Sequence, residues 1–159
     1  MTTIYLIRHG QASFGAESYD KLSPNGELQA KLLGQYFNQI LKEEPYVVAG
    51  SMQRHQQTAN LALAECFPDT RIMTDNAWNE FNHQQVFAQY EPRFNEPHLL
   101  KQDVENEANP RAYLAKIFEG AIERWTGGDY HHEYDESWPN FKSRVETALQ
   151  NLSDELAKT

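Results

Sequence analysis

The stretch IYLIRHG, residues 4–10, decides the fold that we expect for this chain. Its first four residues are a continuous apolar run rich in β-formers, a pattern typical of a strand covered on both faces in a parallel sheet. Arg8 and His9 follow directly, and Gly10 lets the backbone turn sharply and lets a ligand approach. Two basic side chains therefore stand at the end of a predicted buried strand, where open α/β sheets bind ligands.

A helix is predicted next, because Ser23 is a good N-cap and Pro24 suits the first helical position. Gly34 lies within it and indicates close packing against a neighbour. The apolar stripe of this helix is expected to contain Leu28, Leu32, Tyr36 and Ile40, widened by Leu33, Phe37 and Leu41.

Strand and helix signals then alternate. Residues 46–50 predict a second buried strand, residues 51–67 a helix with Ser51 as its N-cap, and residues 71–74 a short third strand. The order β-α-β-α-β predicts an α/β fold with a parallel sheet.

The polar stretch 76–109 is predicted to be a partly helical excursion that folds over the site. A helix is expected from Asn109-Pro110, then a loop over 127–137, and a last helix from about Pro139. The inward residues of the last helix are predicted to be Phe141, Val145, Ala148, Leu149, Leu152 and Leu156. No linker divides the sequence, so residues 1–159 are predicted to form one domain.

Composition narrows the function classes. The formal net charge of −9 argues against binding to nucleic acid or to an acidic membrane surface, which needs clustered Lys and Arg. A small anionic ligand still fits if a few positive charges gather in one pocket. Cys66 is the only cysteine, so no internal disulfide can form. We expect Cys66 to act as a small buried hydrophobic residue. With no secretory signal and no membrane-length apolar run, we expect a cytoplasmic protein.

Arg54 is a further basic residue, at the start of the helix that follows the second predicted strand. Together with Arg8, His9 and the positive end of that helix, it would converge on one crevice and form a phosphate site. Taken singly, Arg8 suits a strand end paired with an acid, and Arg54 suits a solvated helix surface. The joint pattern favours the phosphate site.

His9 suits nucleophilic chemistry at such a site. A neutral imidazole attacks phosphorus, and flanking guanidinium groups disfavour its protonated form and stabilise the charge of the transition state. Water would then release the phosphoryl group from His9. Glu80, after the third predicted strand, is placed to protonate the leaving alcohol, although an ordinary surface acid is the alternative for it.

At these residues the chain resembles the histidine phosphatase superfamily, the phosphoglycerate mutase-like proteins. The resemblance rests on four motifs in order: LIRHG at 6–10, LSPNGELQA at 22–30, GSMQRHQQTA at 50–59, and Glu80. One departure within them is Met52, where a proline is common in the family.

The resemblance implies a three-layer α/β/α sandwich with a mostly parallel central sheet. It implies that His9 is the phosphorylated nucleophile, that Arg8 and Arg54 clamp the phosphate, and that Glu80 is the general acid and then base. It also assigns Gln11 and Ser13, with Gly10, to the substrate pocket. The implied activity is hydrolysis of a small phosphomonoester, without metal or other cofactor. Mutase activity is the related alternative, and hydrolysis is favoured over it.

A second departure concerns the end of the chain. The family pattern has a late strand with a second histidine after the last amphipathic helix, and residues 137–159 show the helix but neither of these. The rival hypothesis is therefore a catalytically impaired domain that binds phosphate or a partner. An exposed sheet edge would also suit a homodimer.

His55, His131 and His132 are assigned no role in the predicted site. His55 adjoins Arg54 and is expected on another face of its helix, about 100° away. His131 and His132, with Glu133, match no closed metal site and predict a solvated loop.

Overall fold

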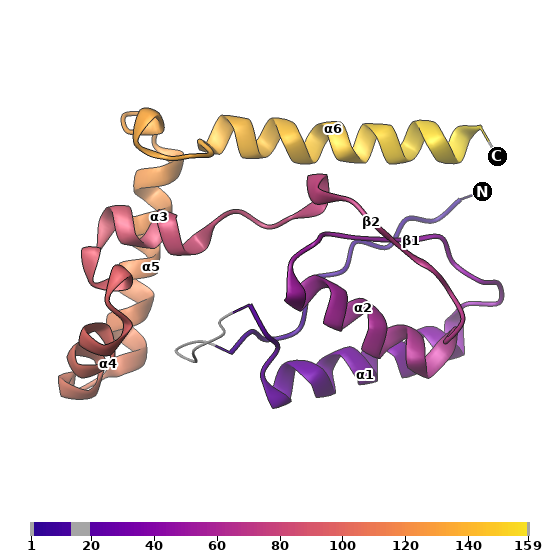
Figure 1. Ribbon diagram of the computed structural model, residues 1–159, viewed down its shortest axis with the longest axis horizontal. Helices are drawn as coiled ribbons and strands as arrows, with labels where there is room; N and C mark the ends of the chain where they lie inside the picture. Colours follow the sequence, from indigo (N-terminus) through magenta and orange to yellow (C-terminus); the bar gives the residue numbers. More distant parts are fainter. Residues whose placement is uncertain (1, 14–19, 159) are drawn as a thin grey trace. The chain divides into compact units, whose positions relative to one another are not determined.

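The structure, a computed structural model, describes residues 2–13 and 20–158. It shows a mixed, helix-rich α/β chain with a small parallel sheet of two strands (Figure 1). The chain divides into two compact units: the first comprises Met1–Asn79 with Asp154–Thr159, and the second comprises Glu80–Ser153.

The sheet of the first unit confirms two of the predicted strands. β1 (Val47–Ala49) pairs in parallel with β2 (Ile72–Thr74), with Val48 opposite Met73. α2 (Gln53–Cys66) makes the crossover between them, as the β-α-β order predicted. The carboxyl ends of both strands therefore meet at one edge, which is where α2 begins.

α1 (Pro24–Ile40) begins as predicted, because the Ser23 side chain accepts a hydrogen bond from the Gly26 N–H. The predicted apolar stripe is wrong at Leu28, Leu32 and Tyr36, which are 54%, 54% and 55% exposed, whereas Phe37 is buried as predicted. The buried face instead consists of Gly26, Ala30, Gly34 and Phe37. Small residues let the helix backbones approach closely, and a Cβ on Gly34 would lie nearer than 3.0 Å to the Ala62 carbonyl of α2. The packing role expected for Gly34 is thus confirmed.

The strand predicted at residues 4–7 is wrong. Among the described residues none pairs with this segment, and its side chains are exposed, Leu6 by 71%. A strand exists only through hydrogen bonds to a neighbour, which an apolar run does not supply by itself. Tyr5 of this segment contacts α1, where its ring and that of Phe37 meet edge to face at 5.4 Å between centroids.

In the first unit β2 is followed by the short helix η1 (Asn76–Trp78), and the named elements of the second unit are all helices. The helical character predicted within 76–109 is confirmed. The elements of the second unit are α3 (His83–Tyr90), η2 (Pro92–Asn95), α4 (Pro97–Asn106), α5 (Pro110–Thr126), η3 (His131–Glu133) and α6 (Trp138–Ala157), whose residues from Asp154 onward are assigned to the first unit.

Trp125 of α5 is the largest side chain in the core of the second unit, where it packs with Val86, Ala121 and Tyr134. α5 begins at Pro110 as predicted, and the Asn109 side chain caps it by accepting from the Ala112 N–H. In α6, Ala148 is buried as expected, but Leu149 is exposed, because it lies at the edge of the apolar stripe.

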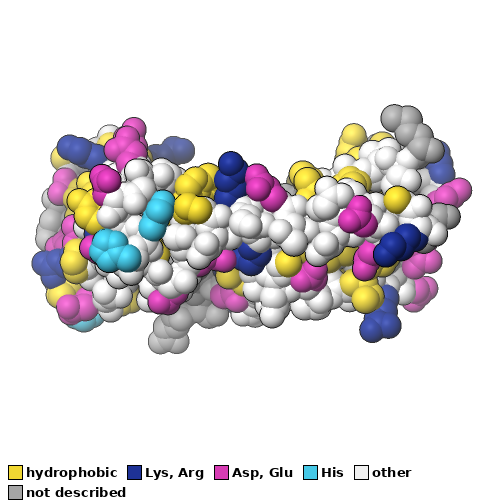
Figure 2. All heavy atoms as spheres, turned by 90° about the horizontal axis from the view of Figure 1, so that it is seen from above, with side chains coloured by type: hydrophobic (Ala, Val, Ile, Leu, Met, Phe, Trp, Pro, Cys, Tyr) yellow, Lys and Arg dark blue, Asp and Glu magenta, His cyan; other side chains and the backbone are white. Residues whose placement is uncertain are grey.

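The surface carries mixed charges. On the face shown in Figure 2, Lys and Arg side chains are interspersed with Asp and Glu side chains instead of gathering in one field. Of the helices in the described part of the chain, none is long and apolar enough to cross a membrane.

Candidate active site

The turn after residues 4–7 packs between α1 and α2. The Gly10 N–H donates to the Thr58 hydroxyl at 3.1 Å, and this hydroxyl donates to the Arg54 carbonyl in α2 at 2.7 Å. On the other side, a Cβ on Gly10 would lie nearer than 3.0 Å to the Gly26 carbonyl in α1. Glycine at this position thus lets the turn reach both helices, and it holds His9 beside the start of α2.

His9 is half-buried, and a hydrogen bond determines which of its nitrogens is reactive. Its Nδ1 lies 2.6 Å from the Gly10 carbonyl oxygen. A carbonyl oxygen only accepts, so Nδ1 carries the proton in the neutral ring, and Nε2 keeps its lone pair. The turn therefore presents His9 as an Nε2 nucleophile or ligand.

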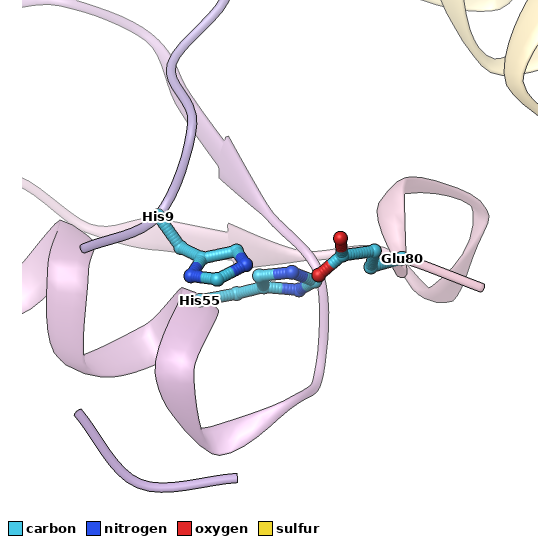
Figure 3. Close-up of side chains that lie close together, drawn as sticks. All are labelled: His9, His55 and Glu80. Carbon is cyan, nitrogen blue, oxygen red and sulfur yellow. The ribbon is translucent and has the colours of Figure 1, made fainter. Parts of the chain in front are cut away.

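His55 lies beside His9, and the expectation that it faces elsewhere is wrong. The two ring centroids are 5.6 Å apart, with the rings tilted by 48° (Figure 3). His55 and Arg54 are successive residues of α2, so they point in directions about 100° apart. Arg54 contacts Asp20, whereas His55 contacts His9. Gly50 makes the room, because a Cβ there would overlap His55 Nδ1 and Asn79 Oδ1.

Glu80 is held next to these rings by the residue before it. Asn79 accepts a hydrogen bond from the Ser51 N–H at 2.7 Å and donates one to the Ser51 hydroxyl at 2.9 Å. Ser51 therefore tethers this segment. The prediction that Ser51 is the N-cap of α2 is wrong, because the cap is Met52, which makes no side-chain hydrogen bond. His9, His55 and Glu80 each offer a nitrogen or oxygen, and these atoms lie within 4.8 Å of one another (Figure 3).

Arg54 is buried, with 3% of its surface exposed. Its Nη1 donates to Asp20 Oδ1 at 2.7 Å, and Asp20 Oδ2 accepts from the Gln53 N–H at 2.8 Å. A carboxylate thus binds both the guanidinium group and the N-terminus of α2, as an anion is expected to do there. Sequence reasoning missed Asp20, which lies more than thirty residues before its partner and in no motif.

The remaining predicted site residues lie around the same turn. Arg8 is exposed, and the Ser13 N–H donates to the Lys21 carbonyl at 2.8 Å. Gln11 supports the start of α1: its Oε1 accepts from the Ser23 hydroxyl at 3.0 Å and from Asn25 Nδ2 at 3.1 Å. The substrate-binding roles of Gln11 and Ser13 stay predictions.

Comparison with known proteins agrees with the motifs. The family model described as histidine phosphatase superfamily (branch 1) matches residues 4–159, nearly the whole chain. No significant match was found among curated proteins or among solved structures. The match covers the His9 turn, the start of α2 and Glu80 together. The chain belongs to the histidine phosphatase superfamily.

Proposed function

We propose that the chain is a phosphomonoester hydrolase that acts through a phosphohistidine at His9. The observation that carries the proposal is the hydrogen bond from Nδ1 to the Gly10 carbonyl, which places the proton of the neutral ring on Nδ1 and the lone pair on Nε2. Membership of the superfamily supports phosphatase or mutase chemistry in general. The substrate class is a small phosphorylated alcohol.

The reaction has two steps. Nε2 of His9 forms a bond to phosphorus while the bond from phosphorus to the ester oxygen breaks, and the Glu80 carboxyl gives its proton to the leaving alkoxide. A water then attacks the phosphoryl group, the P–N bond breaks, and the Glu80 carboxylate takes the proton of that water. Free phosphate leaves, and both residues return to their starting states.

Phosphate oxygens would be held by Arg8, Arg54 and the N-terminus of α2. Because Asp20 binds the Arg54 guanidinium and the Gln53 N–H, we propose that it occupies the place of a phosphate oxygen and yields to substrate. Gly10, Gln11 and Ser13 would line the pocket beside the transferred group. The proposal also includes the three-layer arrangement of the superfamily, a single domain and a cytoplasmic location. It favours hydrolysis over mutase chemistry.

A second candidate function follows from the Arg54 ion pair. If Asp20 does not yield, the domain would bind phosphate weakly at Arg8 and have no turnover, which fits a phosphate-binding or partner-binding protein. The same carboxylate at 2.7 Å favours this alternative.

Turnover of p-nitrophenyl phosphate separates the two candidates. We expect hydrolysis by the parent protein that persists in EDTA and that His9→Ala abolishes. His98→Ala is the matched control, since His98 is exposed in α4 and should leave the rate unaltered. Binding of phosphate without any turnover would refute the enzyme and favour the second candidate.

A further inference from the structure

Two imidazoles and a carboxylate meet beside the turn, and His55 has no part in the proposed reaction. We propose that His9, His55 and Glu80 bind a divalent transition-metal cation of the zinc type. We propose also that this cation inhibits phosphoryl transfer by taking the lone pair of His9; this second statement rests on the proposed function, and the first does not.

The donor set selects the class of cation. Two histidine nitrogens and one carboxylate oxygen are typical of zinc sites with three protein ligands and one open position. Magnesium and calcium prefer sets made of oxygens, so the two imidazoles disfavour them. A zinc-type cation is therefore the occupant that fits these residues.

The geometry is close to that of a metal site. Metal–ligand bonds of about 2.1 Å in a tetrahedron place ligand atoms ~3.4 Å apart. The donor atoms of His9, His55 and Glu80 lie within 4.8 Å of one another, so small side-chain rotations would close the set. In Figure 3 the two rings lie side by side, and the Glu80 carboxylate points toward the His55 ring.

The surroundings also orient the ligands. The Nδ1 of His9 donates to the Gly10 carbonyl, and a backbone carbonyl in this role is a common outer partner of a metal-binding histidine. His55 packs against Gly50, where any side chain would displace its ring. Asn79 is bonded to Ser51, and Glu80 is the next residue, so the third ligand begins from a tethered backbone.

Inhibition follows from competition for one atom. Nε2 of His9 cannot bond to a metal ion and to phosphorus at the same time. A cation at this position would therefore block formation of the phosphohistidine, and a chelator would restore it. A trace of metal carried through purification would then appear as activation by EDTA.

Titration of the full chain with Co²⁺, followed by its visible d–d absorption, tests the site without reference to activity. We expect one saturable site per chain, from which Zn²⁺ displaces Co²⁺. His55→Ala and Glu80→Gln should each weaken binding by roughly 10- to 100-fold or more, because losing a ligand is at least as severe as losing an outer partner. His98→Ala and Glu119→Gln, both on exposed positions, should bind as the parent does.

Equal Co²⁺ affinity in the parent and His55→Ala, with both folded by circular dichroism, would overturn the site. If His55→Ala fails to fold, His55→Gln provides the same comparison. In the phosphatase assay, Zn²⁺ should inhibit the parent, EDTA should reverse this, and the residual activity of His55→Ala should resist the same Zn²⁺ concentration. Co²⁺ binding without any turnover would refute the proposed function alone, and turnover without Co²⁺ binding would refute the metal site alone.

Discussion

Replacing Gly34 by alanine would place a methyl group in the contact between α1 and α2. Two effects oppose each other. Alanine favours a helix interior over glycine by about 1 kcal/mol. The new Cβ, however, would lie nearer than 3.0 Å to the Ala62 carbonyl, a backbone atom that cannot rotate away. Overpacking of this kind typically costs about 1–3 kcal/mol, and parting the helices would also expose Ala30 and Leu63.

We therefore expect Gly34→Ala to lower the free energy of unfolding by about 1–2 kcal/mol, measured by urea unfolding with far-ultraviolet circular dichroism. Gly120 of α5 provides a matched control. A Cβ there would meet the end of the Tyr90 side chain, which is exposed and can swing aside, so Gly120→Ala should leave stability unchanged or raise it. A Gly34→Ala protein as stable as its parent would refute the close-packing argument.

Three further changes test other parts of the structure. Burial raises the pKa of the Cys66 thiol, so iodoacetamide should alkylate the folded protein more slowly than the urea-unfolded chain at mildly alkaline pH, with the difference shrinking as pH rises above the folded pKa; equal rates would contradict this burial. Trp125→Ala should reduce stability by about 3–5 kcal/mol in thermal unfolding, because it empties a core position and removes the donor to the Glu136 carbonyl; a loss below about 1 kcal/mol would contradict the core assignment. Asp20→Asn should lower the free energy of unfolding by about 1–2 kcal/mol, a modest loss because the Asp20 carboxylate is partly solvated. Added phosphate should raise the melting temperature of this variant more than that of the parent, and an equal rise would argue against exchange of Asp20 for phosphate on Arg54.

Features determined by neighbouring residues were predictable from the sequence. The caps at Ser23 and Asn109 rest on bonds that reach only three residues along the chain, so their positions followed from residue type. Ser51 has the same residue type as Ser23, but Asn79 competes for it, and no local pattern reveals a partner so distant in sequence. The helix therefore begins one residue later than expected.

Features determined by packing were harder to predict. The apolar run at residues 4–7 has the composition of a strand, yet strand formation depends on a neighbouring strand and not on composition. In α1 the bulky residues suggested the buried face, whereas contact between two backbones at Gly34 and Ala62 determined it.

The candidate site divides in the same way. The motifs located His9, Arg54 and Glu80, and the structure places His9 and Glu80 close together. His55 was missed because helix periodicity gives the direction of a side chain around the helix axis. It does not tell which other segments, here the turn at His9, pack against that face. A usable signal was present: a histidine shortly after each of two consecutive strand-like runs, with Gly50 leaving space for the second.

Trapping of the phosphorylated protein tests the central claim most directly. The protein would be mixed with p-nitrophenyl phosphate, quenched in base, and analysed by intact mass and peptide mapping, with His9→Ala alongside. We predict one phosphoryl group on His9 that is stable in base and lost in acid, and none in His9→Ala. Turnover with no phosphoryl group on His9, or with the group on another residue, would contradict the account.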